Sequence, residues 1–240
     1  MPRRLSWHFF LDRNVDQEKI RRSDREKWNT DPRVGDSQLD NDYYRNNDWD
    51  RGHLVQRASA SWGDTDRAAQ QASDDTMFYT NCALQHENLN QDEWLALEDW
   101  VNFLEDDSTN KISVFSGPIY GDAAAGARFV RPNRGGGEAA EVPAAFFKVV
   151  VFIDKSRRLA VRAFVMVQDR LALSDKSGAR SRMFDLQAYQ VTVTMIMRET
   201  GLVFPEEVVQ ANPLFFNPGP EAERVGKCSA PTVVGCPVNC

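Results

Sequence analysis

The sequence lacks the long apolar runs and leader features that would place the chain in or across a membrane. No apolar run approaches the roughly 20 residues that a helix needs to cross a bilayer. The basic start leads only into a short stretch, residues 5–11, which Ser6 and His8 interrupt and no small-residue cleavage site follows. A signal peptide is therefore not expected. The compartment stays open, and a trimmed secreted or periplasmic form is compatible with the sequence.

Cysteine is scarce as well. The chain has four cysteines, and their spacing matches no zinc site. Cys82 stands alone, whereas Cys228, Cys236 and Cys240 lie in the last part of the chain, where one disulfide fits their positions. The pattern assigns neither a structural metal nor a redox compartment.

A general excess of positive charge is also missing, since the net charge is −6 over 240 residues. This balance argues against a nucleic-acid-binding coat over the whole surface. The charges are unevenly distributed: residues 68–110 contain ten Asp or Glu and no Lys or Arg, whereas residues 128–182 contain twelve Lys or Arg and five acids. The basic part could follow a phosphate backbone, although a charge run is more often only a solvated face.

The most informative stretch is Asp50-Arg51-Gly52-His53. It combines an imidazole that titrates near neutral pH, a guanidinium that can hold phosphate, and a carboxylate. Asp and Gly also form turns, so a solvated surface turn explains the same four residues.

A second stretch, residues 80–98, carries several amides and a carboxylate. Apolar residues from 90 to 105 recur at three- and four-residue steps, which predicts an amphipathic helix: Trp94, Leu97, Val101 and Leu104. Extending the stripe back by four residues reaches Asn90, a polar amide directed inward. Helix N-capping is the alternative role for Asn90.

Together, DRGH and the block at residues 80–98 resemble the DNA/RNA non-specific endonuclease family. The resemblance runs from about Trp7 to about Gln210. It implies an α+β fold of the ββα-metal (His-Me finger) type, with a central, mostly antiparallel sheet flanked by helices. One domain at residues 1–211 is expected, followed by a Pro-, Gly- and Cys-rich tail at residues 212–240.

The resemblance implies roles for residues of this chain. His53 is expected to be the general base, and Asn90 the protein ligand of one Mg²⁺ ion, which Mn²⁺ or another divalent ion can replace. Glu98 is expected to hold a metal-bound water, and Asn81 to orient His53 or the waters of the metal. Asp50 is expected to shape a turn rather than to bind metal.

Other side chains are expected to contact the nucleic acid: Arg25, Arg51, Gln85, Arg128, Arg131 and Arg134. Arg51 would clamp phosphate, and Gln85 would also brace the shell around the metal. Arg22 is the alternative to Arg25 as the arginine that reaches the scissile phosphate, and a solvated arginine in a charged helix explains either one equally well. The last three arginines fall in a Gly- and Ala-rich insertion, residues 121–142, which we expect to be mobile.

Two histidines outside DRGH are expected to have no catalytic role, namely His8 inside a strand and His86 in a loop. Ala96 stands where members of the family often carry an arginine. The expected strands are residues 5–11, 77–80, 111–120, 144–153, 159–167 and 189–193, and the expected helices are residues 90–105 and 194–200.

The sequence therefore predicts a metal-dependent endonuclease. By resemblance it would hydrolyse DNA and RNA with little sequence specificity and leave 5′-phosphate ends. The alternatives are a non-catalytic nucleic-acid-binding protein of the same fold, and a toxin-type nuclease restrained by an inhibitor protein. DNA and RNA are the expected partners, no membrane partner is expected, and the oligomeric state is not assigned.

Overall fold

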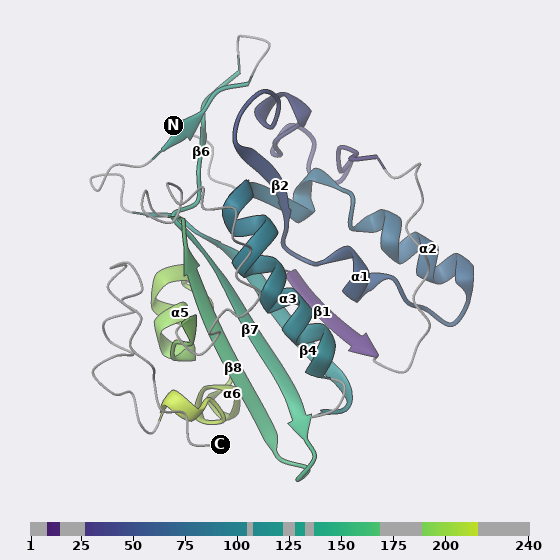
Figure 1. Ribbon diagram of the computed structural model, residues 1–240, viewed down its shortest axis with the longest axis vertical. Helices are drawn as coiled ribbons and strands as arrows, with labels where there is room; N and C mark the ends of the chain where they lie inside the picture. The colour runs from purple at the N-terminus through teal and green to yellow at the C-terminus, as the bar shows by residue number, and fades with distance from the viewer. Residues whose placement is uncertain are drawn as a thin grey trace.

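A four-stranded sheet forms the centre of the molecule (Figure 1). The computed structural model describes residues 9–14, 27–104, 108–121, 128–132, 137–168 and 189–215, the first of these ranges by its backbone alone. The strands lie in the order β1-β4-β7-β8, and every neighbouring pair is antiparallel. They are β1 (Phe9–Asn14), β4 (Ser108–Ile119), β7 (Ala145–Asp154) and β8 (Leu159–Val167).

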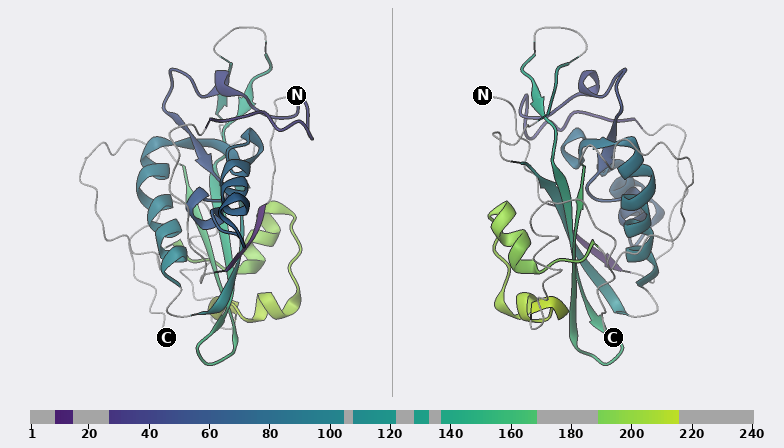
Figure 2. Two further views of the ribbon diagram at one scale, coloured as in Figure 1. Left: turned by 90° about the vertical axis from the view of Figure 1, so that its right-hand side faces the viewer. Right: turned by 60° about the vertical axis from the view of Figure 1, so that its left-hand side comes forward.

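Helices cover both faces of this sheet. Helix α3 (Trp94–Phe103) lies on one face, and helices α5 (Val193–Thr200) and α6 (Glu206–Gln210) lie on the other (Figure 2). The expected α+β architecture, with an antiparallel central sheet flanked by helices, is therefore confirmed.

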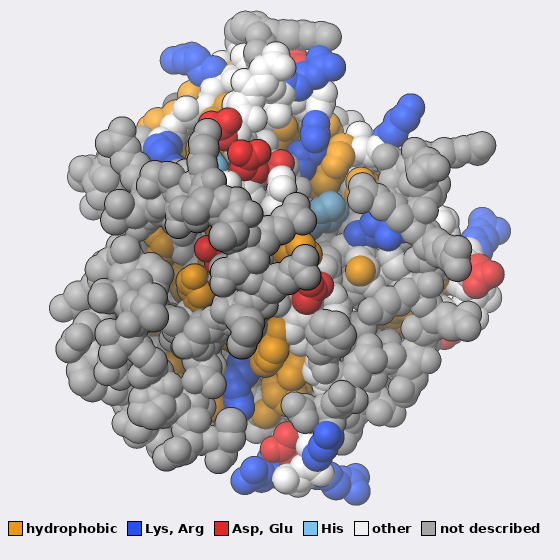
Figure 3. Space-filling model, viewed as in Figure 1, with side chains coloured by type: hydrophobic (Ala, Val, Ile, Leu, Met, Phe, Trp, Pro, Cys, Tyr) orange, Lys and Arg blue, Asp and Glu red, His pale blue; other side chains and the backbone are white. Residues whose placement is uncertain are grey.

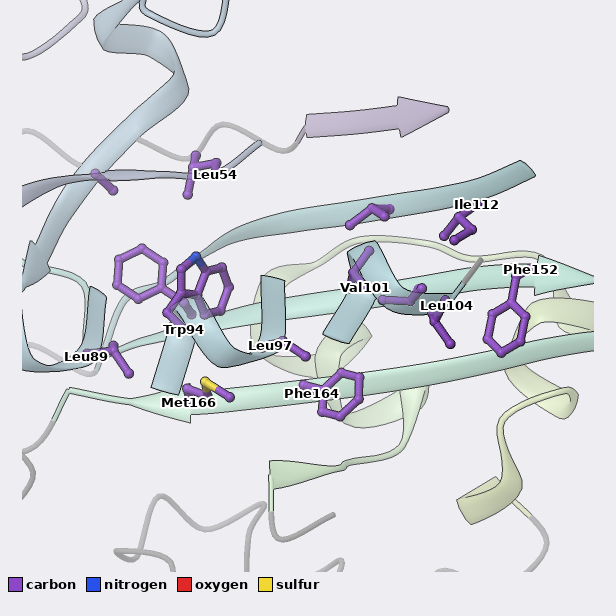
Figure 4. Close-up of a cluster of buried hydrophobic side chains, with 14 of the residues drawn as sticks. Leu54, Leu89, Trp94, Leu97, Val101, Leu104, Ile112, Phe152, Phe164 and Met166 are labelled. Carbon is purple, nitrogen blue, oxygen red and sulfur yellow. The ribbon is translucent and has the colours of Figure 1, made fainter. Parts of the chain in front are cut away.

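Strand β7 supplies side chains to the core on both faces. Phe146, Val150 and Phe152 enter the cluster that includes the apolar stripe of α3 (Figure 4). Phe147 and Val149 enter the cluster beneath α5 and α6. Because side chains alternate along a strand, a nearly continuous apolar run is what a strand covered on both faces requires.

A second, smaller sheet pairs β2 (Trp49–His53) with β3 (Cys82–His86). The chain between them forms helices α1 (Arg57–Ala60) and α2 (Asp66–Asp75) and the 3₁₀ turn η2 (Tyr79–Asn81). After β3 the chain enters the π-helical turn η3 (Leu89–Glu93) and continues into α3. The two strands and the helix that carry the predicted site are thus consecutive parts of one unit.

Gln168 joins this hairpin to the end of the main sheet. Its Nε2 donates to the carbonyl oxygens of Leu84 and Pro143, at 3.1 and 2.9 Å, and its Oε1 accepts from the backbone N–H of His86 at 2.6 Å. The residue is 1% exposed, so water competes little for these bonds. The sequence offered no periodic signal for this role.

Several predicted elements agree with the structure. The strands expected at residues 111–120, 144–153 and 159–167 are present, as is the hairpin turn between the last two. The helix at residues 90–105 is present, although it begins as a π-helical turn. The helix near residues 194–200 ends at Gly201, whose φ of 73° is the left-handed conformation that glycine adopts readily.

Other predicted elements are wrong in part. The strand expected at residues 77–80 begins instead at Cys82, because residues 79–81 form η2. The strand expected at residues 189–193 is reduced to a single bridge between Phe164 and Gln190. The first strand is described at residues 9–14, which agrees with the expected strand at residues 9–11, and residues 5–8 lie outside the described ranges. Helix α2 was not expected, because its sequence is polar and has no long apolar stripe.

The remaining described elements are short. They are η1 (Asn41–Tyr43), β5 (Phe129–Val130), β6 (Ala140–Glu141) and η7 (Pro213–Phe215). Leu214 of η7 is buried, so packing continues past the expected domain boundary at residue 211. None of the helices in the described ranges is long and apolar enough to cross a membrane.

Candidate active site

The DRGH residues lie on strand β2, not in a turn. Cross-strand partners in β3 are Gln85 for Asp50 and Cys82 for His53. Because side chains alternate along a strand, Arg51 and His53 share one face of the hairpin, and Asp50 occupies the other. The expectation that Asp50 shapes a turn is therefore wrong.

Gly52 is required by the close approach of Gln85. A Cβ atom at position 52 would lie 2.2 Å from Gln85 Oε1 and 2.4 Å from Gln85 Cβ. Gln85 is fully buried, and neither its Nε2 nor its Oε1 has a hydrogen-bond partner among the described residues. The predicted contact between Gln85 and nucleic acid is wrong for this conformation, because no surface of the side chain is accessible.

Asp50 holds the predicted metal ligand. Asn90 Nδ2 donates to Asp50 Oδ2 at 2.9 Å, and Gln91 Nε2 donates to the same oxygen at 3.0 Å. Both donors lie in η3, and π-helical turns of this kind are often found at functional sites.

The amide of Asn90 is oriented by this contact. Since Nδ2 faces Asp50, Oδ1 is directed away from it, and no donor among the described residues bonds to Oδ1. The N-cap position of η3 belongs to Asn88, so the capping interpretation of Asn90 is wrong. The amide oxygen of Asn90 therefore retains its capacity to bind a cation.

The position of His53 is fixed through its backbone and its ring. Trp94 Nε1 lies 3.4 Å from the carbonyl oxygen of His53, and the next residue, Leu54, donates its N–H to the carbonyl oxygen of Asn81 at 3.0 Å. The ring of Trp28 lies against the imidazole, with 4.7 Å between centroids. The helix that carries Asn90 and Glu98 thus lies directly against the end of the strand that carries His53.

Asn81 acts on this site through the backbone. Its Oδ1 accepts from the N–H of Val55 at 3.0 Å, and its Nδ2 donates to the carbonyl oxygens of Val55 and Thr76 at 3.0 and 2.9 Å. The side chain is 3% exposed. These bonds hold the chain just after His53 and leave the amide directed at backbone groups.

Arg51 lies among aromatic side chains. Its Nη2 donates to Asn41 Oδ1, and its guanidinium carbon lies 5.5 Å from the centroid of the Tyr44 ring. Tyr79 and the buried thiol of Cys82 belong to the same cluster, and burial raises the pKa of Cys82 to about 12. Among the described residues, Arg51 is therefore held in place by an amide and a ring rather than by a carboxylate.

Glu98 forms a buried ion pair with Lys148 of β7. The distance from Lys148 Nζ to Glu98 Oε1 is 3.6 Å, and both side chains are nearly inaccessible. Burial raises the pKa of Glu98 to about 7, an effect that the charge of Lys148 partly offsets. Burial disfavours the charged form of each group, so it lowers the pKa of Lys148. The sequence did contain a signal for Lys148, because a lysine in the middle of an apolar strand must find a buried partner.

His86 ends strand β3 rather than lying in a loop, so its expected position is wrong. Its Nδ1 accepts from the N–H of Asn88 at 3.2 Å, and its ring meets that of Trp49 edge-on at 5.5 Å. Burial lowers the pKa of His86.

The predicted phosphate-contacting arginines divide into two groups. Arg128 lies 5.1 Å from the centroid of the Trp49 ring and donates to the carbonyl oxygen of Gln168, whereas Arg131 is exposed. Outside the described residues lie Arg22, Arg25, Arg134, His8 and the three cysteines of the tail.

The surface near the hairpin carries mixed charge. Figure 3 shows histidine atoms at the surface, with Lys or Arg side chains above and beside them and acidic side chains nearby. A base, an amide oxygen and a carboxylate on adjoining elements can together activate water and bind a cation.

The sequence matches the family described as DNA/RNA non-specific endonuclease over residues 2–211. An uncharacterized protein of Sinorhizobium fredii, y4fB, is 32% identical over 206 residues, which are 77% of this chain and 28% of that protein. Human mitochondrial endonuclease G is 29% identical over 168 residues, which are 69% of this chain and 51% of that protein. This chain therefore spans only part of the length of these relatives.

Among solved structures, one of an EndoG/EndoGI complex resembles the chain with a TM-score of 0.63. The match covers 82% of this chain and 77% of the other, at 21% sequence identity. At this identity the likeness identifies the fold, which is the ββα-metal fold that the sequence predicted.

Proposed function

This chain belongs to the DNA/RNA non-specific endonuclease family, and from that premise we propose that it hydrolyses phosphodiester bonds of DNA and RNA with a divalent metal ion. The observation that carries the proposal is the junction between β2 and the helical segment η3-α3. There, Asp50 binds Asn90, and Trp94 lies against the carbonyl oxygen of His53. The strand end that carries His53 and the helical segment that carries Asn90 and Glu98 thereby adjoin, and phosphodiester hydrolysis needs a base together with groups that hold a cation.

The residues at this junction fit a magnesium-class ion. Asn90 would hold the ion through Oδ1, since Mg²⁺ commonly keeps several waters and takes one or two protein ligands. No group of three His, Cys, Asp or Glu in the described ranges is placed to hold a metal, and a site of this kind needs none. When bound, the ion supplies positive charge to the phosphate and to the departing oxygen.

His53 accepts the proton of the attacking water. Neutral imidazole is a suitable base near pH 7, and the backbone bonds around His53 fix the strand end from which the ring extends. Attack at phosphorus with breakage of the bond to the 3′ oxygen leaves the 5′-phosphate that we propose as product. Glu98, on the same helical segment as Asn90, would order a water of the ion.

Arg51 holds a phosphate of the bound strand, as its planar fork suits. The bond to Asn41 and the contact with Tyr44 keep the guanidinium in one orientation. Arg25 remains a proposed second phosphate contact. Because these groups address phosphate and not base edges, cleavage should depend little on sequence.

A direct test is incubation of the protein with supercoiled plasmid and with total RNA. We expect cleavage of both in Mg²⁺ or Mn²⁺, none in EDTA, and 5′-phosphate ends that a ligase can join. Binding of both nucleic acids without cleavage in either ion would support a non-catalytic binding protein instead. Cleavage that persists in EDTA would contradict the metal-dependent mechanism.

The exposed Arg131 provides a test of where nucleic acid binds on the surface. We propose that it contacts phosphate, so Arg131→Ala should weaken binding to every sequence about equally. The slope of log K against log salt should fall by about 0.9 for duplex DNA, and the turnover number at saturating substrate should stay unchanged. Measurement needs only salt titrations of binding on two unrelated duplexes.

Arg128→Ala is the informative comparison, because Arg128 also packs on Trp49. It should lower the melting temperature, whereas Arg131→Ala should not. An unaltered salt slope in Arg131→Ala would show that nucleic acid does not contact Arg131. The nuclease proposal would not be affected by that result.

A protein inhibitor is a further proposed partner. The support is limited to the similar solved structure, which is of an EndoG/EndoGI complex. Suppression of plasmid cleavage by a protease-sensitive component of a lysate would be the expected result.

A further inference from the structure

Lys148 occupies an unusual place for a lysine. It lies in the middle of β7, is 3% exposed, and points to the same face of the sheet as Phe146 and Val150, which belong to the core under α3. Lysine is almost never fully buried unless it is paired. Burial of the Lys148 ammonium therefore carries a desolvation cost, and two contacts of the side chain offset this cost.

Both contacts of Lys148 are with α3. Nζ lies 3.6 Å from Glu98 Oε1 and 4.5 Å from the centroid of the Trp94 ring. Among the described residues, Glu98 Oε1 has no hydrogen-bond partner. The ammonium is thus the main group that faces this carboxylate oxygen.

These two contacts lead to the proposed active site. Asn90, Trp94 and Glu98 are spaced four residues apart, so they lie along one side of the continuous helical segment η3-α3. Trp94 meets the carbonyl oxygen of His53, and Asn90 meets Asp50. Lys148 therefore contacts two of the three residues on this side of the helical segment, Trp94 and Glu98.

Bulk water screens the pair only weakly. A cavity of about 10 Å³ lies beside it, with Gln56, Ser59 and Ser116 among its lining residues. A space of this size holds about one water molecule. In such surroundings an ionic contact constrains geometry more strongly than it would at the surface.

We propose that Lys148 is a positioning residue of the active site that holds the Glu98 carboxylate in place. This inference rests on the proposed function in one respect, namely that Glu98 takes part in it. A purely structural ion pair is the competing explanation, because buried pairs can often be replaced by apolar residues without loss of stability.

The test compares Lys148→Met, Lys148→Arg, Glu98→Gln and the double variant Lys148→Met/Glu98→Gln in the full chain. Lys155→Met, at the exposed turn between β7 and β8, is the matched control for loss of a lysine. The measurements are thermal unfolding, Mn²⁺ affinity by calorimetry, and kcat and KM on plasmid.

We expect Lys148→Met to weaken Mn²⁺ binding or to lower kcat by ~10- to 100-fold, as loss of a group that orients a metal site typically does. KM should remain near the wild-type value. Lys148→Arg should recover part of the loss, because it keeps the charge. The double variant should be no less active than Glu98→Gln. Lys148 is proposed to act by holding the Glu98 carboxylate, and that carboxylate is already absent in Glu98→Gln.

A stably folded Lys148→Met with wild-type kcat and Mn²⁺ affinity would overturn the proposal. So would a double variant at least tenfold less active than Glu98→Gln, since Lys148 would then act independently of Glu98. If Lys148→Met alone fails to fold, the comparison of the double variant with Glu98→Gln still decides. The Mn²⁺ measurement does not depend on cleavage, so its outcome is separable from failure of the nuclease proposal.

Discussion

Replacement of His53 by Ala should lower the turnover number by about 10² to 10⁴-fold, the usual contribution of a general base. Binding of nucleic acid should remain close to normal, because phosphate contacts hold the substrate. Folding should also be retained, since the contacts that anchor this strand end are made by the backbone of residues 53 and 54. The measurement is single-turnover cleavage of plasmid beside a binding titration in EDTA.

Added imidazole offers a control for this variant. A small base that enters the space left by the side chain should restore part of the lost rate, and the recovery should follow the fraction of neutral imidazole. A His53→Ala protein that cleaves within threefold of the wild-type rate would remove His53 from the role of base. The metal proposal would survive that result.

Replacement of Asn90 by Ala should weaken metal dependence and turnover together. The variant loses the amide oxygen proposed to bind the ion and leaves Asp50 with Gln91 as its remaining donor in η3. Higher Mg²⁺ should be needed for half-maximal rate, and the rate at saturating Mg²⁺ should stay well below wild type. Metal titrations of cleavage and Mn²⁺ calorimetry measure the two effects separately.

Asn90→Asp is the sharper version of this test. It adds charge to the proposed ligand, so Mn²⁺ should bind more tightly, yet the rate should not recover fully. The charge on the ion is then partly neutralised, and the new carboxylate faces Asp50 without the present hydrogen bond. The exchange Asp50→Asn/Asn90→Asp restores a donor and an acceptor and should relieve that repulsion.

Gln91→Ala is the neighbouring control. Gln91 donates to the same oxygen of Asp50 but is exposed, so its loss should alter the metal titration much less than loss of Asn90. Equal metal titrations and rates in Asn90→Ala and wild type would leave Asn90 with only its structural bond to Asp50.

The sequence predicted the local patterns of this protein well. The alternation and apolar runs of the main strands, and the apolar stripe of α3, follow from burial of one or both faces, and burial leaves a periodic trace in the sequence. DRGH and the amide block identified the residues that the fold brings together because both are short motifs with fixed spacing.

Contacts between distant segments were harder to predict. Asp50 reaches Asn90, Lys148 reaches Glu98, and Gln168 reaches Leu84, in each case across 40 or more residues of chain. Such pairs leave no local period, because each depends on how the strands and helices are stacked. Polar residues in apolar strands were the only trace, and Lys148 shows how such a residue could be recognised.

The two ends of the segment between β2 and β3 are hydrogen-bonded to each other, and this has a consequence for how members of the family can differ in length. Leu54 and Asn81 are bonded to each other, and the Asn81 side chain also binds Val55, so this segment leaves the hairpin and returns at one point. Doubling the length of a flexible loop adds only about 0.6 kcal/mol of closure entropy. Insertions at the exposed residues 64–65, between α1 and α2, should therefore leave the spacing of His53, Asn90 and Glu98 unchanged, because the paired strands set that spacing and this turn does not.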